Sequence, residues 1–156
     1  MFKVSNDNPI TVISTWYRNW FINFDIKPHS IQTGWTSILH FTTERSHGVK
    51  GSRVPAFFLS PNSKAIQLVY DVNDILSYNI MKSSPLPSHR FTNVNMNQTY
   101  DRSTNSYIVN AHIGDKNISM VNHDATIFNN VIVYAADRWS PAADVTLRNL
   151  IYFSYP

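Results

Sequence analysis

The chain has no cysteine, only four glycines and a single glutamate, Glu44, among its 156 residues. The lack of cysteine excludes disulfides and thiolate metal sites. No apolar run approaches the roughly 20 residues that a membrane-spanning helix needs, so no membrane span is expected. Charged residues make up 15% of the chain and the net charge is +3. Because no run of Lys and Arg alternates with aromatic residues, nucleic-acid binding is not expected either.

The same shortages argue against an enzyme. Glycoside hydrolases use two carboxylates, typically glutamates, on either side of the bond they cleave, whereas this chain has one glutamate. The sequence contains no Gly-x-Ser-x-Gly, no phosphate-binding glycine loop and no His-Glu-x-x-His. A pair of aspartates brought together by folding stays open, because spatial neighbours are invisible in a sequence. We predict a protein without catalytic activity.

What the chain does contain is a series of short segments in which apolar and polar residues alternate. The clearest is Trp20–Lys27, whose period of two is typical of a strand with one buried and one wet face. Trp35–Glu44 repeats the pattern, so its polar row is expected to face solvent. The core residues expected from these two segments are Ile22, Phe24, Ile26, Leu39 and Phe41.

Turn-forming residues separate about ten such segments, and none shows a convincing helical period. The expected strands are Thr11–Thr15, Trp20–Lys27, Trp35–Glu44, Val54–Leu59, Ala65–Val72, Phe91–Tyr100, Ser106–Ile113, Ile118–Val121, Asn130–Ala135 and Asp144–Phe153. Asn73–Ser83 fits a further strand less clearly. No linker or repeat interrupts the series, so we predict one domain over residues 1–156. Its expected fold is all-β, an antiparallel two-sheet jelly-roll sandwich with about five or six strands in each sheet.

The order of these segments resembles the concanavalin-A-like jelly rolls, in particular their galectin-like and laminin-G-like branches. Trp20–Lys27 and Ser37–Glu44 are similar to the galectin strand pair that leads into the sugar-binding strand. Tyr134–Ala142, followed by Leu147–Tyr152, is similar to the closing turn and strand of laminin-G-like domains in invertebrate, especially cnidarian, extracellular proteins. The resemblance implies a galactose-type lectin, secreted or extracellular, whose partners are glycans or glycoproteins.

The galectin motif is present in part. That family presents His-x-Asn-x-Arg on one strand face, and the corresponding row here is His40-x-Thr42-x-Glu44. Alternate residues of a strand project together, so these three side chains would share an exposed face. Truncating His40 or Glu44 is then expected to weaken glycan binding about tenfold or more, with little change in the melting temperature.

Other residues complete the predicted site. Asn62 follows the next strand, where the family places a sugar-contacting asparagine, and Arg53 opens that strand. The family's stacking tryptophan has no equivalent in Ala65–Tyr70, so a loop aromatic, Trp139 or Trp35, would have to replace it. The predicted carbohydrate-binding residues are therefore His40, Thr42, Glu44, Arg53, Asn62 and Trp139.

Each of these residues also has a structural interpretation. His40 could bond to a neighbour on the sheet, Arg53 could pair with Glu44 or Asp71, and Trp139 could be a packed corner. A laminin-G-like adhesion or structural domain that binds protein, or a viral attachment domain, remains an alternative to a lectin.

A calcium site and self-association are the two remaining expectations. Asp71, Asn73 and Asp74 lie close together in the chain and offer the hard oxygen ligands that calcium prefers. The same residues are common turn formers, so calcium and a plain turn both stay open. Because single lectin sites are weak and act together, a symmetric homodimer is expected.

Overall fold

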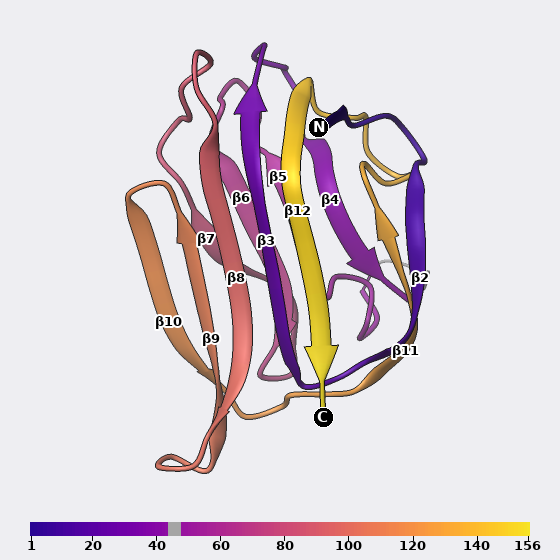
Figure 1. Ribbon diagram of the computed structural model, residues 1–156, viewed down its shortest axis with the longest axis vertical. Helices are drawn as coiled ribbons and strands as arrows, with labels where there is room; N and C mark the ends of the chain where they lie inside the picture. The colour runs from indigo at the N-terminus through magenta and orange to yellow at the C-terminus, as the bar shows by residue number, and fades with distance from the viewer. Residues whose placement is uncertain (44–47) are drawn as a thin grey trace.

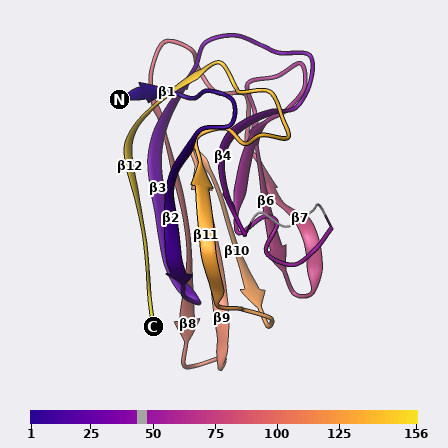
Figure 2. The same cartoon turned by 90° about the vertical axis from the view of Figure 1, so that its right-hand side faces the viewer.

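Two antiparallel six-stranded sheets pack face to face in the computed structural model, which describes residues 1–43 and 48–156 (Figure 1). Figure 2 shows the two layers from the side, with β12 and β3 in one and β4, β6 and β7 in the other. Glu44 lies outside the described residues. Within them, no helix is long and apolar enough to cross a membrane. The predicted jelly-roll sandwich is confirmed.

Each sheet is built from strands that are distant in the sequence. Sheet A contains, in spatial order, β1 (Phe2–Lys3), β12 (Val145–Tyr155), β3 (Asn19–Pro28), β8 (Thr92–Asp101), β9 (Ser106–Ile113) and β10 (Lys116–Asn122). Sheet B contains β2 (Pro9–Trp16), β11 (Phe128–Tyr134), β4 (Thr36–Thr42), β5 (Ala56–Leu59), β6 (Ile66–Val72) and β7 (Ile75–Lys82). Every expected strand is present, Asn73–Ser83 contains β7, and the two-residue β1 is an addition.

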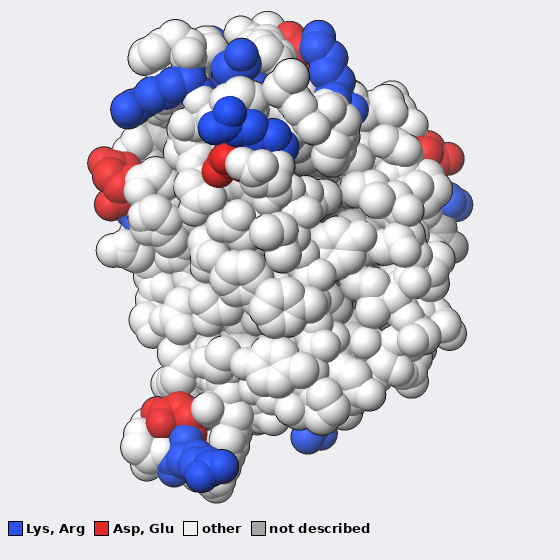
Figure 3. Space-filling model, in the orientation of Figure 1, with Lys and Arg blue, Asp and Glu red and all other residues white. Residues whose placement is uncertain are grey.

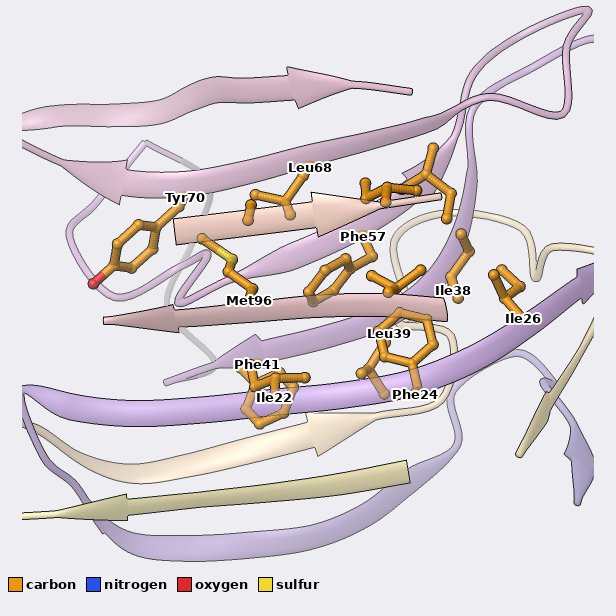
Figure 4. Close-up of a cluster of buried hydrophobic side chains, with 14 of the residues drawn as sticks. Ile22, Phe24, Ile26, Ile38, Leu39, Phe41, Phe57, Leu68, Tyr70 and Met96 are labelled. Carbon is orange, nitrogen blue, oxygen red and sulfur yellow. The ribbon is translucent and has the colours of Figure 1, made fainter. Parts of the chain in front are cut away.

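The core lies between the sheets and follows the alternation of β3. Along this strand the residues alternate strictly between buried and half-buried. Figure 4 shows the side chains of Ile22, Phe24 and Ile26 directed toward those of sheet B. The Phe24 ring meets the Phe57 ring edge-on, with centroids 5.2 Å apart. All five expected core residues are fully buried: Ile22, Phe24, Ile26, Leu39 and Phe41.

Strand β4 departs from the expected alternation, because all seven of its residues are buried. It lies between β11 and β5 in the middle of sheet B. The register shifts between Ser37 and Leu39, and both Ile38 and Leu39 join the core. The outer side of the strand is covered as well, which determines what the predicted site can do.

Candidate functional site

The outer face of sheet B carries a groove over β5, β6 and β7. Strand pairing places His40, Ala56, Val69 and Asn79 in one row across four strands. The neighbouring row pairs Phe58 with Gln67. The groove has a volume of about 300 Å³ and is lined by Trp35, Arg53, Phe58, Gln67, Val69, Asn79 and Ser140.

Apolar and polar groups alternate around this groove. Phe58 and Val69 form an apolar floor together with Ala56. The Trp35 side chain stands beside it and is 48% exposed. Gln67 is held in place because its Nε2 donates to the Met81 carbonyl oxygen at 3.1 Å. A fixed amide, an exposed indole and an apolar floor are typical of ligand pockets.

Among the described residues that line the groove, Arg53 is the one that is charged. Its guanidinium lies over the Phe58 ring, 5.6 Å from the ring centroid. Its Nε is buried and has no hydrogen-bond partner among the described residues. Pairing of its side chain with Asp71, one of the structural interpretations that the sequence left open, is not observed. Asp71 Oδ2 instead accepts the backbone N–H of Arg53 at 3.5 Å and of Gly51 at 3.0 Å.

His40 lies beneath the loops beside the groove and forms a buried pair with Asp137. Its Nδ1 is 2.8 Å from Asp137 Oδ2, and its Nε2 is 2.6 Å from the carbonyl oxygen of Ser52. Both oxygens are acceptors, so the ring satisfies both when each nitrogen carries a proton, as in the imidazolium form. The pair therefore links the segment before Arg53 to the connection between β11 and β12.

Asp137 organises that connection. Its Oδ1 accepts the backbone N–H groups of Trp139 at 2.9 Å and Ser140 at 2.8 Å. Burial alone would raise the pKa of Asp137, but the hydrogen bond and charge of His40 and the Ser140 N–H outweigh it, and the pKa lies below its usual range. The carboxylate thus stays charged and holds Ser140 at the rim of the groove.

The exposed polar row predicted on β4 is wrong. His40 is 1% exposed and Thr42 is 0% exposed. The Trp139 ring packs against His40 with centroids 5.6 Å apart, and the Phe58 ring lies 6.0 Å away. A central strand covered on both sides cannot present an open face, so neither side chain is available to a surface ligand.

The other predicted site residues are divided between the groove and its surroundings. Arg53 lines the groove, and Trp139, 39% exposed, stands next to the lining residue Ser140. The Trp139 ring also packs on Tyr134, with centroids 6.1 Å apart, as expected for a packed corner. Asn62 is exposed in the turn after β5, where its N–H donates to the Gln32 carbonyl oxygen at 2.8 Å, and it is not among the lining residues.

Of the seven described residues that line the groove, the sequence indicated Arg53 and, as a possible replacement aromatic, Trp35, but not the other five. Gln67 had a usable signal, because a lone amide in the apolar segment Ala65–Val72 is unusual for a buried strand. Phe58 gave none, since an aromatic in an apolar strand reads as core. The five missed residues are Phe58, Gln67, Val69, Asn79 and Ser140.

The predicted calcium ligands point to separate partners. Asp71 Oδ1 accepts the Ser77 N–H at 2.7 Å, and Asn73 bonds to the backbone of Val121 and His123. A hydrogen bond with Asp124 raises the pKa of Asp74. Among the described residues, no three His, Cys, Asp or Glu side chains group as metal ligands would. Calcium therefore stays a prediction without a formed site.

A larger hollow, about 510 Å³, lies at one end of the sandwich near Leu86, Arg90 and Phe91. Its aromatic ring is already covered. The Arg148 guanidinium lies 3.9 Å and the Lys27 amine 5.2 Å from the Phe91 centroid. The groove on sheet B, with its open indole, is the better candidate for a ligand that stacks.

No protein-family model matches the sequence, and no curated protein matches it. Among solved structures, an alginate lyase from Pseudomonas aeruginosa aligns with a TM-score of 0.58 at 10% identity, covering 91% of this chain and 68% of that one. A carbohydrate-binding module from Bacillus subtilis gives 0.47 at 9% identity, covering 95% and 83%. The exoplasmic/lumenal domain of VIP36, in a form bound to Ca²⁺ and Man3GlcNAc, gives 0.45 at 16% identity, covering 92% and 72%.

At such identities the likeness to the lyase shows a shared jelly-roll fold and nothing finer. The chain is thus similar in architecture to the concanavalin-A-like sandwiches that the sequence resembles. The galectin-like and cnidarian types stay predictions.

Proposed function

We propose that the groove on the outer face of sheet B binds carbohydrate, and that the protein acts as a lectin rather than an enzyme. The observation that carries the proposal is the exposed Trp35 indole beside the Gln67 amide and the Arg53 guanidinium. A sugar ring has an apolar C–H face that packs on an aromatic ring and hydroxyls that need donors and acceptors. The groove offers both kinds of contact side by side.

Strand β6 supports this role by holding the Gln67 amide in place. Gln67 lies on β6 between two paired strands, and its amide nitrogen is already bonded. Asn79, on the edge strand β7, is exposed. Because a fixed group loses little entropy on binding, even a few such contacts give useful affinity.

The lining favours binding over catalysis. Arg53 is the one ionisable residue in the described part of the lining, and a guanidinium does not release its proton in the range where acid–base catalysis operates. Glycan cleavage is the second candidate function, since the lyase from Pseudomonas aeruginosa has the same fold and acts, by its name, on alginate. Release of shortened products during incubation with a bound glycan would support cleavage and contradict the proposal.

We predict that Trp35→Ala weakens glycan binding about tenfold or more, because truncating an aromatic anchor removes its whole contact area. The wild-type protein is first screened on a glycan array that includes galactose-bearing ligands, and the variant is then titrated with the best ligand. Tyr100→Ala is the matched control, since this ring is 44% exposed at the far end of sheet A. Equal affinity of Trp35→Ala and wild type would place the site elsewhere.

The same array decides between the remaining alternatives. Binding lost on chelation would support the predicted calcium requirement, and binding retained would exclude it. If this chain binds no glycan but binds a protein partner, the laminin-G-like or viral attachment alternatives would be favoured. Glycan binding also fits the secreted or extracellular location that the resemblance implies.

We further propose a homodimer formed through β12. Its residues from Arg148 to Tyr155 pair on one side with β3, while β1 covers only Thr146 and Leu147. Three large side chains along this edge are about half exposed: Ile151, Phe153 and Tyr155. Figure 3 shows the face of the molecule on which β12 lies. Charged side chains gather at the two ends of this face and leave its middle uncharged. A long apolar edge strand pairs readily with a second copy.

Light scattering at tens of micromolar is therefore expected to report a dimer, and Phe153→Asp to report a monomer, because a charge at the edge opposes pairing. Thr99→Asp places the same charge on β8, away from the edge, and should leave the dimer intact. A wild-type protein that is strictly monomeric at this concentration would contradict the proposal.

A further inference from the structure

Arg53 indicates which class of sugar the groove takes. We propose, on the basis of the carbohydrate-binding function above, that the ligand is a hexuronate and that its carboxylate binds the Arg53 guanidinium. The groove contains this cation, and no described lining residue carries the opposite charge.

The charge of Arg53 has no protein partner among the described residues. Its guanidinium lies over Phe58, and its Nε is buried without a hydrogen bond. A buried donor with no acceptor is costly unless a ligand supplies one. A ligand carboxylate beside the guanidinium would therefore supply the counter-charge that Arg53 lacks among the described residues.

The nearest carboxylates are committed to other groups. Asp71 accepts backbone N–H groups of Gly51 and Ser77, at 3.0 and 2.7 Å. Asp137 is paired with His40 at 2.8 Å and also accepts two backbone N–H groups. Neither side chain forms a hydrogen bond or an ion pair with the Arg53 guanidinium, so among the described residues no acid neutralises it, and a ligand carboxylate can.

The backbone of Arg53 is fixed before any ligand arrives. Its carbonyl oxygen accepts the Asp71 N–H at 3.0 Å, and the carbonyl of Ser52 accepts the His40 ring at 2.6 Å. The side chain therefore starts from a fixed backbone, and its guanidinium lies over the Phe58 ring in the groove that Trp35 also lines. A planar guanidinium binds a planar carboxylate through two parallel hydrogen bonds, a geometry that a neutral hydroxymethyl group cannot match.

A hexuronate satisfies all parts of the groove at once. Its ring can pack on the Trp35 indole, its hydroxyls can meet Gln67 and Asn79, and its carboxylate can meet Arg53. A volume of about 300 Å³ is at the lower end for ligand pockets, which suits a short stretch of sugar rather than a long one.

The test compares each hexuronate with its own neutral form. Oligosaccharides of galacturonate, glucuronate and mannuronate are titrated beside their carboxyl-reduced counterparts at low salt. We expect at least one hexuronate to bind about tenfold or more tightly than its reduced form, because charge-assisted hydrogen bonds are roughly twice as strong as neutral ones. Arg53→Gln should abolish this preference while retaining the weaker binding of the reduced sugar.

Arg102→Gln is the matched control. It removes the same charge from the exposed turn between β8 and β9 on the other sheet, and it should keep the full preference. A preference that survives in Arg53→Gln would overturn the assignment to Arg53. Equal binding of acidic and reduced sugars would overturn the hexuronate inference and leave the lectin proposal standing, whereas binding of no glycan on any array would overturn both.

Discussion

Replacing His40 with alanine is expected to lower the free energy of unfolding by about 3–5 kcal/mol. The side chain is 1% exposed and forms its hydrogen bonds to Asp137 and to the Ser52 carbonyl oxygen. Without the imidazole, a buried carboxylate loses its counter-charge and a buried carbonyl loses its donor. From the sequence alone, an exposed His40 was expected, and truncating it was expected to leave the melting temperature nearly unchanged. The buried His40 of the structure predicts the opposite.

Urea unfolding at neutral pH checks this prediction. His112→Ala is the matched control, because His112 is an exposed histidine on the outer face of sheet A, and it should change the unfolding free energy by about 0.5 kcal/mol or less. If His40→Ala changed the unfolding free energy as little as His112→Ala does, the buried pair of His40 and Asp137 would be contradicted.

The same pair predicts how stability depends on pH. The folded-state pKa of Asp137 is lowered, so its contribution to stability is present above the ordinary aspartate pKa of about 3.9 and is lost as the pH falls through the lower folded-state pKa. The difference between wild type and Asp137→Asn should therefore be largest near neutral pH and shrink in acid.

Replacing Phe24 with alanine is expected to cost about 3–5 kcal/mol of stability, as for other large-to-small changes in a packed core. The ring is 0% exposed and meets the Phe57 ring from the opposite sheet at 5.2 Å. Its loss leaves a cavity in the hydrophobic core between the two sheets.

Phe153→Ala makes the same chemical change at a ring that is 49% exposed. Measured at a dilution where the chain is monomeric, it should cost about 1 kcal/mol or less, because little buried area is lost. Similar losses for both variants would mean that Phe24 is not in a closely packed core.

The strands could be predicted because their signal is local. Along β3 each side chain meets either the core or the surface, so the sequence itself alternates. The same holds for β8, with Val94 and Met96 buried between polar neighbours. The two-residue β1 is too short to show a period.

The site could be predicted only in part because its burial depends on distant segments. Alternation placed His40 on the outer face of sheet B correctly, but the covering of that face by Trp139 depends on a connection about 100 residues later in the chain. Arg53 was found from its position before a strand. Its lack of an acidic partner depends on how Asp71 and Asp137 bond, which no local pattern encodes.

The indole N–H signals of the four tryptophans test the central claim most directly. Trp16 and Trp20 are each 1% exposed in the core, whereas Trp35 is 48% exposed at the groove. Titration with the best glycan from the array, followed by nuclear magnetic resonance, should shift the Trp35 indole signal and leave those of Trp16 and Trp20 in place. A glycan that binds without moving the Trp35 signal would contradict the proposed groove.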